Sequence, residues 1–201
     1  MALFIVFEGL DGSGKSTQVR ALFRRLRREG HQVLLTREPG GTPLGEALRR
    51  WLKRSRHLAL LSELSLFIAA RAQLVEDVVR PALEAGVTVI GDRYTASTVA
   101  YQGHGRRLDL ALLDQLNRAA TGGLTPDLTV LLDLPVQAGL ARKLNSEADT
   151  FDAAPLAFHR KVRDGYLALA AQDPGHWLVL DGTRPKRELS RLIWTKIQPL
   201  L

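Results

Sequence analysis

Five short apolar runs divide the chain, at residues 3–7, 33–35, 87–90, 128–134 and 177–180. Their apolar residues follow one another with little polar alternation, which is typical of parallel strands buried on both faces of a sheet. Between the runs, apolar residues recur three or four positions apart, and this spacing predicts helices. The expected helices cover about 15–29, 44–53, 60–84, 109–121, 136–144, 156–171 and 186–198. Alternating strands and helices indicate an α/β fold with a parallel sheet and crossover helices.

The length of the chain, 201 residues, fits one domain, because a single core usually divides only beyond about 250 residues. We therefore expect one domain over 1–201. Residues 144–155, LNSEADTFDAAP, show neither a strand nor a helix period. They are either a plain surface loop or an excursion from the compact domain.

Composition narrows the possible functions. The absence of cysteine excludes disulfides, thiolate metal sites and cysteine nucleophiles. No segment has the ~18 apolar residues of a membrane span, and the start MALFIVF lacks the basic region of a signal peptide. We therefore expect a cytoplasmic protein. The net charge of +7 favours anionic partners, although the arginines of RALFRRLRREG (20–30) also fit a solvated helix face.

A glycine-rich loop follows the first apolar run. Gly9, Gly14, Lys15 and Ser16 fit the pattern G-x-x-x-x-G-K-[ST] between a predicted strand and a predicted helix. In such loops the backbone N–H groups surround a polyphosphate, the lysine reaches the β- and γ-phosphates, and the hydroxyl binds Mg²⁺. The predicted site for a nucleoside triphosphate comprises Gly9, Leu10, Asp11, Gly12, Ser13, Gly14, Lys15, Ser16 and Thr17. The N-K-x-D motif of GTPases is absent.

Two charged residues end the third apolar run. Asp92 and Arg93 should emerge at the carboxyl edge of the sheet, where open α/β sheets bind ligands. A carboxylate there can hold the water shell of Mg²⁺, and an arginine can bind a phosphate with two hydrogen bonds. Taken alone, the pair also fits a surface ion pair.

With these residues in place, the chain closely resembles the thymidylate kinases. The segments that carry the resemblance are FEGLDGSGKST (7–17), TREPGGTPLGE (36–46), LFIAARAQ (66–73), GDRYTASTVAYQG (91–103), TPDLTVLLDLP (125–135) and VRDGYLALA (162–170). The resemblance implies a three-layer P-loop kinase fold, with a five-stranded parallel sheet of order 2-3-1-4-5 flanked by helices and a short lid at about 142–155. It also implies transfer of a phosphoryl group from Mg-ATP to dTMP, giving dTDP and ADP for dTTP biosynthesis.

The resemblance assigns acceptor roles to single residues. Asp11 matches an acid that accepts a hydrogen bond from the 3′-hydroxyl of dTMP. Phe67 matches the ring that stacks on thymine, although without the family it reads as a core residue. Arg71, one helical turn further on, matches the arginine that bonds a thymine carbonyl.

Further matches surround the acceptor. Arg93 resembles the clamp on its 5′-phosphate, with Arg37 as a neighbour at the same end, and Tyr101 the ring that crowds the 2′ side of the sugar. Thr98 and Gln102 match polar positions facing the base, and Ser97 would then orient their loop. Thr183 and Arg184 follow the last strand where the family passes the adenine of ATP.

The pattern fails at one place. The family brings an arginine to the transferred phosphoryl from the glycine loop or from the lid, but this chain has Gly12 in the loop and Thr150 in the lid position. We therefore expect Arg142 to supply the charge, with Lys143 and Arg163 as alternatives, or with Arg142 and Lys143 facing solvent. The catalytic candidates are Lys15, Asp92, Arg93 and Arg142, and Ser16 and Asp92 are the candidate Mg²⁺ residues. No strong general base is required, because the acceptor phosphate is already anionic.

Other functions remain open at this stage. A kinase for another nucleoside monophosphate or for deoxynucleosides fits less well, because these enzymes lack the REPGG block or carry E-R-S in place of Asp92-Arg93-Tyr94. A nucleotide sensor or a basic nucleic-acid switch agrees with the charge, but only 6% of the residues are aromatic. The expected partners are ATP, dTMP and a second copy of the chain that packs along 62–79, with no nucleic acid and no membrane.

Overall fold

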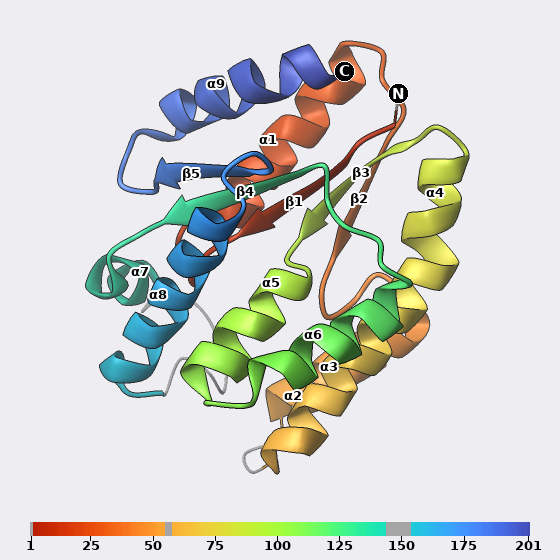
Figure 1. Cartoon of the computed structure of the whole chain (residues 1–201). Helices are drawn as coiled ribbons and strands as arrows, with labels where there is room; N and C mark the ends of the chain where they lie inside the picture. The colour runs from red at the N-terminus through yellow and green to blue at the C-terminus, as the bar shows by residue number, and fades with distance from the viewer. Residues whose placement is uncertain (1, 55–57, 144–153) are drawn as a thin grey trace.

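A computed structural model describes residues 2–54, 58–143 and 154–201 of the chain. Five strands form one parallel sheet in the order β2-β3-β1-β4-β5 (Figure 1). The strands are β1 (Phe4–Glu8), β2 (Val33–Arg37), β3 (Thr88–Asp92), β4 (Leu128–Asp133) and β5 (Trp177–Asp181). The α/β class and the strand order predicted from the sequence are confirmed.

Nine α-helices connect and cover the strands in the described residues. They are α1 (Lys15–Arg28), α2 (Pro43–Arg54), α3 (Leu60–Leu74), α4 (Arg80–Glu84), α5 (Thr95–Thr98), α6 (Leu110–Thr121), α7 (Val136–Lys143), α8 (Leu156–Gln172) and α9 (Lys186–Ile197). A π-helical stretch, Val75–Val79, joins α3 to α4, so the helix predicted at 60–84 is one continuous element. A short 3₁₀ turn, Gln198–Leu200, follows α9.

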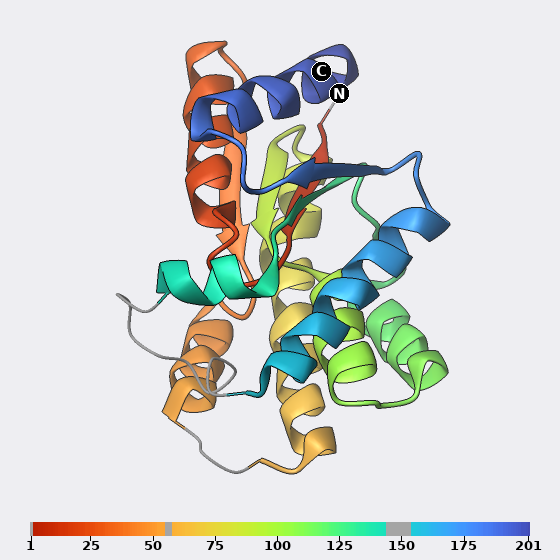
Figure 2. The same cartoon turned by 90° about the vertical axis from the view of Figure 1, so that its left-hand side faces the viewer.

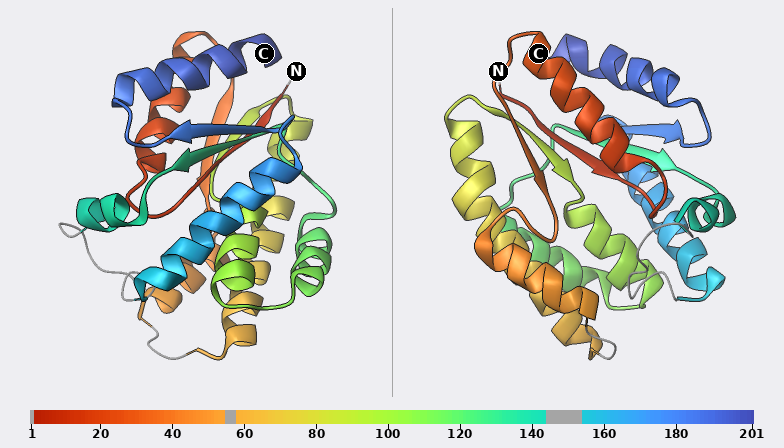
Figure 3. Two further views of the ribbon diagram at one scale, coloured as in Figure 1. Left: turned by 60° about the vertical axis from the view of Figure 1, so that its left-hand side comes forward. Right: turned by 180° about the vertical axis from the view of Figure 1, so that it is seen from behind.

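Successive side chains of each strand point to opposite faces of the sheet, so apolar residues form a core on each face. Ile5 and Phe7 of β1 pack with α1 and α9 on one face of the sheet. Phe4 and Val6 point to the other face, where α3, α4, α5 and α8 lie. Figure 2 shows α1 and α9 together on one side of the sheet, and the right panel of Figure 3 shows α1 crossing that face beside α9. The sheet is therefore the middle of three layers.

The two outer strands differ from the expectation of burial on both faces. Val179 in β5 is 45% exposed, and Leu35 in β2 is 39% exposed. Each of these strands has a neighbour on one side only, so part of its surface reaches solvent.

One helical segment was not predicted from the sequence. Residues 95–105, treated there as a loop, form α5 followed by a π-helical stretch, Val99–Gly105. Small residues and two glycines hide the helical period. Packing stabilises the segment instead: the backbone at Gly105 lies against Phe158 of α8, and His104 fills the space over Gly165. Tertiary contact therefore overrides local propensity here.

The predicted excursion at 142–155 lies largely outside the described residues, which resume at 154 after the end of α7. In the described part of the chain, no helix has the length and apolar content needed to span a bilayer.

Candidate functional site

The glycine loop connects the end of β1 to the start of α1. Gly9, Gly12 and Gly14 all have positive φ angles, which only glycine adopts without strain. These angles let the backbone turn sharply between β1 and α1. Lys15 begins α1 and is 6% exposed. Its Nζ donates to the carbonyl oxygens of Gly9 and Leu10, both at 2.9 Å. This arrangement holds the ammonium inside the loop.

The surroundings of Lys15 disfavour the protonated form of its ammonium group. Burial, together with the nearby Arg93 cation, lowers the pKa of its ammonium to about 8, although Asp11, Asp92 and Glu8 oppose the shift. A polyphosphate in the loop would reverse the imbalance, because an anion beside the ammonium favours its charged form. The loop is therefore electrostatically prepared for an anion.

Ser16 and Asp92 meet at the mouth of the loop. Ser16 Oγ donates to Asp92 Oδ2 at 2.9 Å, across 76 residues of sequence. A hydroxyl and one carboxylate suit Mg²⁺, which keeps several waters and takes its other ligands from substrate phosphates. Among the described residues, no cluster of three or more His, Cys, Asp or Glu side chains could hold a metal alone. The donor set thus fits Mg²⁺ that arrives with a nucleotide.

Arg93 has a strained backbone and many hydrogen bonds. Its φ of 76° lies in the left-handed region, which is uncommon for a residue with a side chain. Its Nη1 donates to Gly9 O (3.2 Å), Ser97 Oγ (3.1 Å) and Tyr166 OH (3.1 Å). Its Nη2 donates to Asp11 Oδ1 at 2.6 Å. Asp11 therefore pairs with Arg93 here, whereas the resemblance assigns it to a sugar hydroxyl.

Two cavities meet at this arginine. The larger, the loop cleft, has a volume of about 1210 Å³ and is lined by residues 11–20, by Asp92 and Arg93, and by Arg142 and Arg184. The smaller, the inner cavity, measures about 140 Å³. It is lined by Asp11, Glu38, Pro39, Arg49, Leu52, Phe67, Arg71, Arg93, Ser97, Thr98, Tyr101 and Gln102. Asp11, Glu38, Arg49 and Arg93 border both cavities.

Seven of the eight residues assigned to the acceptor by resemblance line the inner cavity, and the eighth, Arg37, does not. Phe67 lies half-buried on its wall, so it is more than a core residue. Tyr101 is 7% exposed and packs edge-on against Tyr166. Arg37 lines the loop cleft instead, where its Nη2 bonds both carboxylate oxygens of Glu46 at 3.0 Å.

Arg71 is held by a buried network on the wall of the inner cavity. It is 1% exposed, and its Nε and Nη2 donate to Glu38 Oε2 at 2.8 and 2.6 Å. Its Nη1 donates to Thr98 Oγ1 (3.0 Å) and Asn117 Oδ1 (2.5 Å). Burial raises the pKa of Glu38, and the Arg71 charge opposes this shift. The network fixes the orientation of the guanidinium.

Gln102 is oriented in a similar way. Its Nε2 donates to Glu63 Oε1 at 3.0 Å, and Arg106 Nη2 donates to Glu63 Oε2 at 3.2 Å. Glu38, Glu63 and Asn117 were not predicted from the sequence. Glu38 stands inside the REPGG block, which was a usable signal; Glu63 and Asn117 come from distant segments that carry no motif.

Of the residues predicted for the transferred phosphoryl and the adenine, Arg142 and Arg184 line the loop cleft. Arg142 Nη1 donates to Gly182 O at 3.2 Å and approaches Gly12 O at 3.5 Å. Arg184 lines the cleft and pairs with Glu188 at 2.7 Å. Thr183 Oγ1 donates to Asp181 at 2.7 Å and does not line the cleft.

The structure explains why position 12 is glycine, and it shows one of the alternative arginines, Arg163, paired with a carboxylate. A Cβ at Gly12 would collide with the backbone carbonyl of Gly139 in α7, so no arginine fits there without a shift. Arg163 makes two bonds to Asp133, at 2.6 and 2.8 Å, at the end of β4. Thr150 lies outside the described residues, and the side chain of Lys143 is likewise not described.

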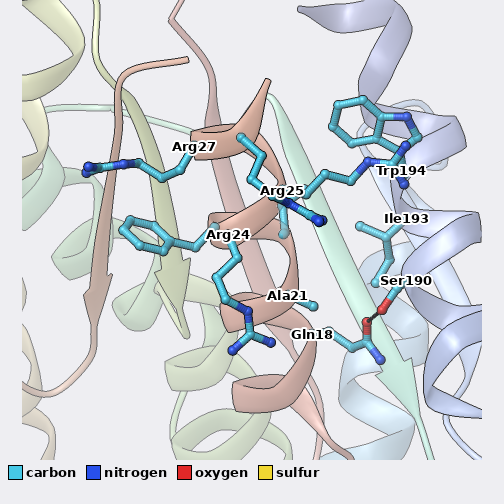
Figure 4. A pocket seen from close by; sticks show the side chains of 11 residues that line it. Gln18, Ala21, Arg24, Arg25, Arg27, Ser190, Ile193 and Trp194 are labelled. Atoms are coloured by element: carbon cyan, nitrogen blue, oxygen red, sulfur yellow. Dashed lines mark hydrogen bonds between the residues drawn. The ribbon is translucent and has the colours of Figure 1, made fainter. Parts of the chain in front are cut away.

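A second basic region lies on the opposite face of the sheet, between α1 and α9 (Figure 4). This arginine groove has a volume of about 740 Å³. It is lined by Gln18, Ala21, Leu22, Phe23, Arg24, Arg25, Arg27, Arg28, Ser190, Ile193 and Trp194. The Arg25 guanidinium stacks 3.9 Å from the Trp194 ring centroid, and Ser190 Oγ donates to Gln18 at 2.7 Å.

Comparison with known proteins agrees with this geometry. The family model described as thymidylate kinase matches residues 7–193. The thymidylate kinase of Thermomicrobium roseum is 50% identical over 203 residues, covering 100% of this chain and 97% of the relative. That of Deinococcus radiodurans is 52% identical over 197 residues, covering 97% and 96%.

A solved structure agrees with the same family. The crystal structure of the thymidylate kinase from Ehrlichia chaffeensis superimposes with a TM-score of 0.81 at 34% identity, covering 98% of each chain. The glycine loop, the adjoining inner cavity and the full-length similarity have one explanation: the chain belongs to the thymidylate kinase family.

Proposed function

We propose that the protein phosphorylates dTMP to dTDP, as a thymidylate kinase does, with ATP bound in the loop cleft and dTMP bound in the inner cavity. One observation carries this proposal: the two cavities share a wall that includes Asp11 and Arg93, together with Glu38 and Arg49, so two phosphates bound on either side would meet beside Arg93. A phosphate oxygen of dTMP attacks the γ-phosphorus of ATP. The bond from that phosphorus to the β–γ bridging oxygen breaks, and ADP leaves.

The donor half rests on the glycine loop. The N–H groups of residues 9–17 bind the β- and γ-phosphates, and Lys15 leaves its carbonyl partners to contact them. Two like charges 4 Å apart repel by about 4 kcal/mol at an effective dielectric constant of 20, so the approach of two phosphates needs added positive charge. Thr183 and Arg184 are proposed neighbours of the adenine, supported by the position of Arg184 on the rim of the cleft.

Ser16 and Asp92 are the proposed Mg²⁺ residues, Ser16 as a ligand and Asp92 through bound water. When bound, Mg²⁺ neutralises charge on the β- and γ-oxygens. The support is the 2.9 Å contact between the two side chains at the mouth of the loop.

The acceptor half rests on Arg93 and the network around Arg71. Arg93 binds the 5′-phosphate of dTMP in exchange for part of its present contacts, and Asp11 then turns to the 3′-hydroxyl. Phe67 stacks on the thymine, Arg71 and Gln102 face its polar edge with Thr98 beside them, and Tyr101 crowds the 2′ side of the sugar. Arg37 contributes charge at the shared end.

Arg142 is our proposed substitute for the missing lid arginine. Its support is the pair of contacts to Gly182 and Gly12, which hold the guanidinium at the rim of the loop cleft. An arginine on the transferred phosphoryl can contribute ~10³-fold in rate, so Arg142→Ala should reduce kcat by a large factor with little change in stability. A kcat within about threefold of the parent would reject this assignment.

One assay tests the proposed function. ADP release from Mg-ATP is measured with dTMP, dUMP, the other monophosphates, thymidine and no acceptor. A preference for dTMP supports the proposal. Turnover with thymidine alone would indicate a nucleoside kinase, and release that does not depend on an acceptor would remove the proposed acceptor site.

Three further proposals concern the chain as a whole. We propose that 1–201 is one domain with a lid at about 142–155, that it works in the cytoplasm, and that it forms a homodimer along 62–79. Exposed Leu61 and Ala69 on α3 support a partner there. Sedimentation equilibrium tests the dimer, and Ala69→Arg should convert it to a monomer.

A further inference from the structure

Glu8, the last residue of β1, has a carboxylate to which neither the glycine-loop pattern nor the family resemblance assigns a role. Glu8 is 0% exposed and directly precedes the glycine loop. Its Oε1 accepts from the backbone N–H groups of Tyr94 (2.8 Å) and Ser97 (3.2 Å). Its Oε2 accepts from Ser97 Oγ (2.6 Å) and Tyr166 OH (2.9 Å). A group that only accepts hydrogen bonds has the geometry of an ionised carboxylate.

The two hydroxyl groups on Oε2 also contact Arg93. Ser97 Oγ and Tyr166 OH each accept from Arg93 Nη1 at 3.1 Å. They come from different elements, α5 and α8, and converge between one anion and one cation. Their oxygens lie 2.9 Å apart. Glu8 is therefore linked to Arg93 through two parallel hydroxyl bridges.

The negative charge decides which way these bridges point. A hydroxyl has one proton and two lone pairs, so a proton given to Glu8 leaves lone pairs for the N–H groups of Arg93. Burial raises the pKa of Glu8, whereas the Arg93 cation and the hydrogen bonds from Ser97, Tyr94 and Tyr166 lower it. The bridges thus run from cation to anion without an opposed pair of donors.

Glu8 also acts on the backbone of Arg93. The N–H that follows Arg93, that of Tyr94, is bound by Glu8 Oε1, and the Arg93 N–H is bound by Phe7 O at 3.0 Å. These two bonds flank the residue whose φ is 76°. A strained conformation of this kind persists only where its surroundings fix it.

We propose that Glu8 is a positioning residue: through Ser97, Tyr166 and the Tyr94 N–H it holds Arg93 in the conformation that receives the acceptor phosphate. Glu8 touches no substrate in this scheme. The inference rests on the proposed role of Arg93 in the reaction, and it names the side chains that preorganise this clamp.

Glu8→Gln is the direct test, because it keeps the size and removes the charge. An amide at position 8 must turn its NH₂ group toward either the two backbone N–H groups or the two hydroxyls. If the NH₂ group faces the two hydroxyls, one hydroxyl can donate its proton to the other. The second hydroxyl then points its proton toward the N–H groups of Arg93, so two donors oppose each other. We expect kcat/KM for dTMP to fall at least tenfold, about 1.4 kcal/mol, with KM for ATP unchanged within about twofold.

A double-mutant cycle separates positioning from simple structural support. Ser97→Ala with Tyr166→Phe should reproduce most of the loss, and Glu8→Gln added to this pair should cost less than about threefold more. Asp127→Asn is the matched control: Asp127 Oδ2 accepts from Phe4 N at 2.7 Å at the opposite end of β1, and its removal should leave kcat/KM for dTMP unchanged. Thermal unfolding of each variant confirms that the chain is folded under assay conditions.

The outcomes are distinct. The proposal is overturned if folded Glu8→Gln keeps the parent kcat/KM for dTMP. It is also overturned if the fold-losses of Glu8→Gln and of the hydroxyl pair multiply when the variants are combined, or if KM for ATP rises as much as KM for dTMP. Should Glu8→Gln fail to fold, the hydroxyl pair alone decides, since unchanged dTMP kinetics there overturn the proposal. Arg93→Lys isolates the premise: if it leaves dTMP kinetics unchanged, the proposed clamp fails rather than its positioning by Glu8.

Discussion

Two sets of arginines, one beside the inner cavity and one in the arginine groove between α1 and α9, differ in how they are held. Arg71 and Arg93 are almost surrounded by acceptors: carboxylates, hydroxyls, an amide and backbone carbonyls. Arg24, Arg27 and Arg28, which line the arginine groove, are exposed. No ion pair to an acidic residue is recorded for these three within the described parts of the chain.

The difference shows that charge and preparation for a ligand are separate properties. An exposed arginine loses rotamer freedom when it binds, and salt screens its charge. A buried arginine has its geometry set during folding, so binding requires little further ordering. The face with more exposed positive charge is therefore not the face expected to do chemistry.

The largest expected effect comes from removing Arg93, one of the two arginines that line both cavities. Arg93→Met should lower kcat/KM for dTMP by ~10³-fold or more, because it removes the cation placed between two phosphates. Steady-state kinetics with dTMP as the varied substrate measures this. A loss below about tenfold would place Arg93 with the exposed arginines rather than with the preorganised ones.

The next effect concerns stability. Arg71→Met leaves Glu38 buried without its counter-charge, and breaking such a pair costs about 3–5 kcal/mol. Urea unfolding at neutral pH should detect this loss, and adding Glu38→Gln should recover part of it. If the free energy of unfolding of the single variant lies within about 1 kcal/mol of the parent value, the pair of Arg71 and Glu38 does not stabilise the fold as predicted.

A smaller effect comes from Lys15. Burial and the nearby Arg93 cation lower the pKa of its ammonium to about 8, so part of the population is unprotonated at mildly alkaline pH. Phosphates beside it raise the pKa, so ATP binding near pH 8 should be accompanied by net proton uptake. Calorimetry in buffers of different ionisation enthalpy measures the uptake.

Two variants serve as controls for this proton count. Lys15→Met should abolish the uptake, while Lys196→Met, an exposed lysine on α9, should leave it unchanged. Net proton release on binding by the parent protein would contradict the assigned electrostatics.

The smallest expected effect is at the arginine groove. Replacing Arg24, Arg27 and Arg28 by glutamine should leave kcat and both KM values within about twofold, because these side chains lie on the far face of the sheet. The same variant should elute from heparin at lower salt, since it loses three positive charges. A clear loss of turnover would remove the distinction between the two arginine sets.

Sequence patterns were sufficient for features that depend on neighbouring residues. The glycine loop, its flanking strand and helix, and the Asp92–Arg93 pair at the end of β3 could all be predicted, because each is a local arrangement. Resemblance to a family extended this to Phe67 and Arg71, whose spacing alone also fits a core helix. The helix over 95–105 was missed because packing against α8, rather than its own period, stabilises it.

By itself, the sequence determined the α/β class, the phosphate loop and the identity of the charged side chains at the carboxyl edge of the sheet. Only the tertiary structure decided which buried groups orient those charges. Glu8 meets Ser97 and Tyr166 across 89 and 158 residues, and Arg71 meets Glu38 and Asn117 across 33 and 46. Such networks form because a buried polar group must find a partner wherever the fold supplies one, and no local period records that requirement.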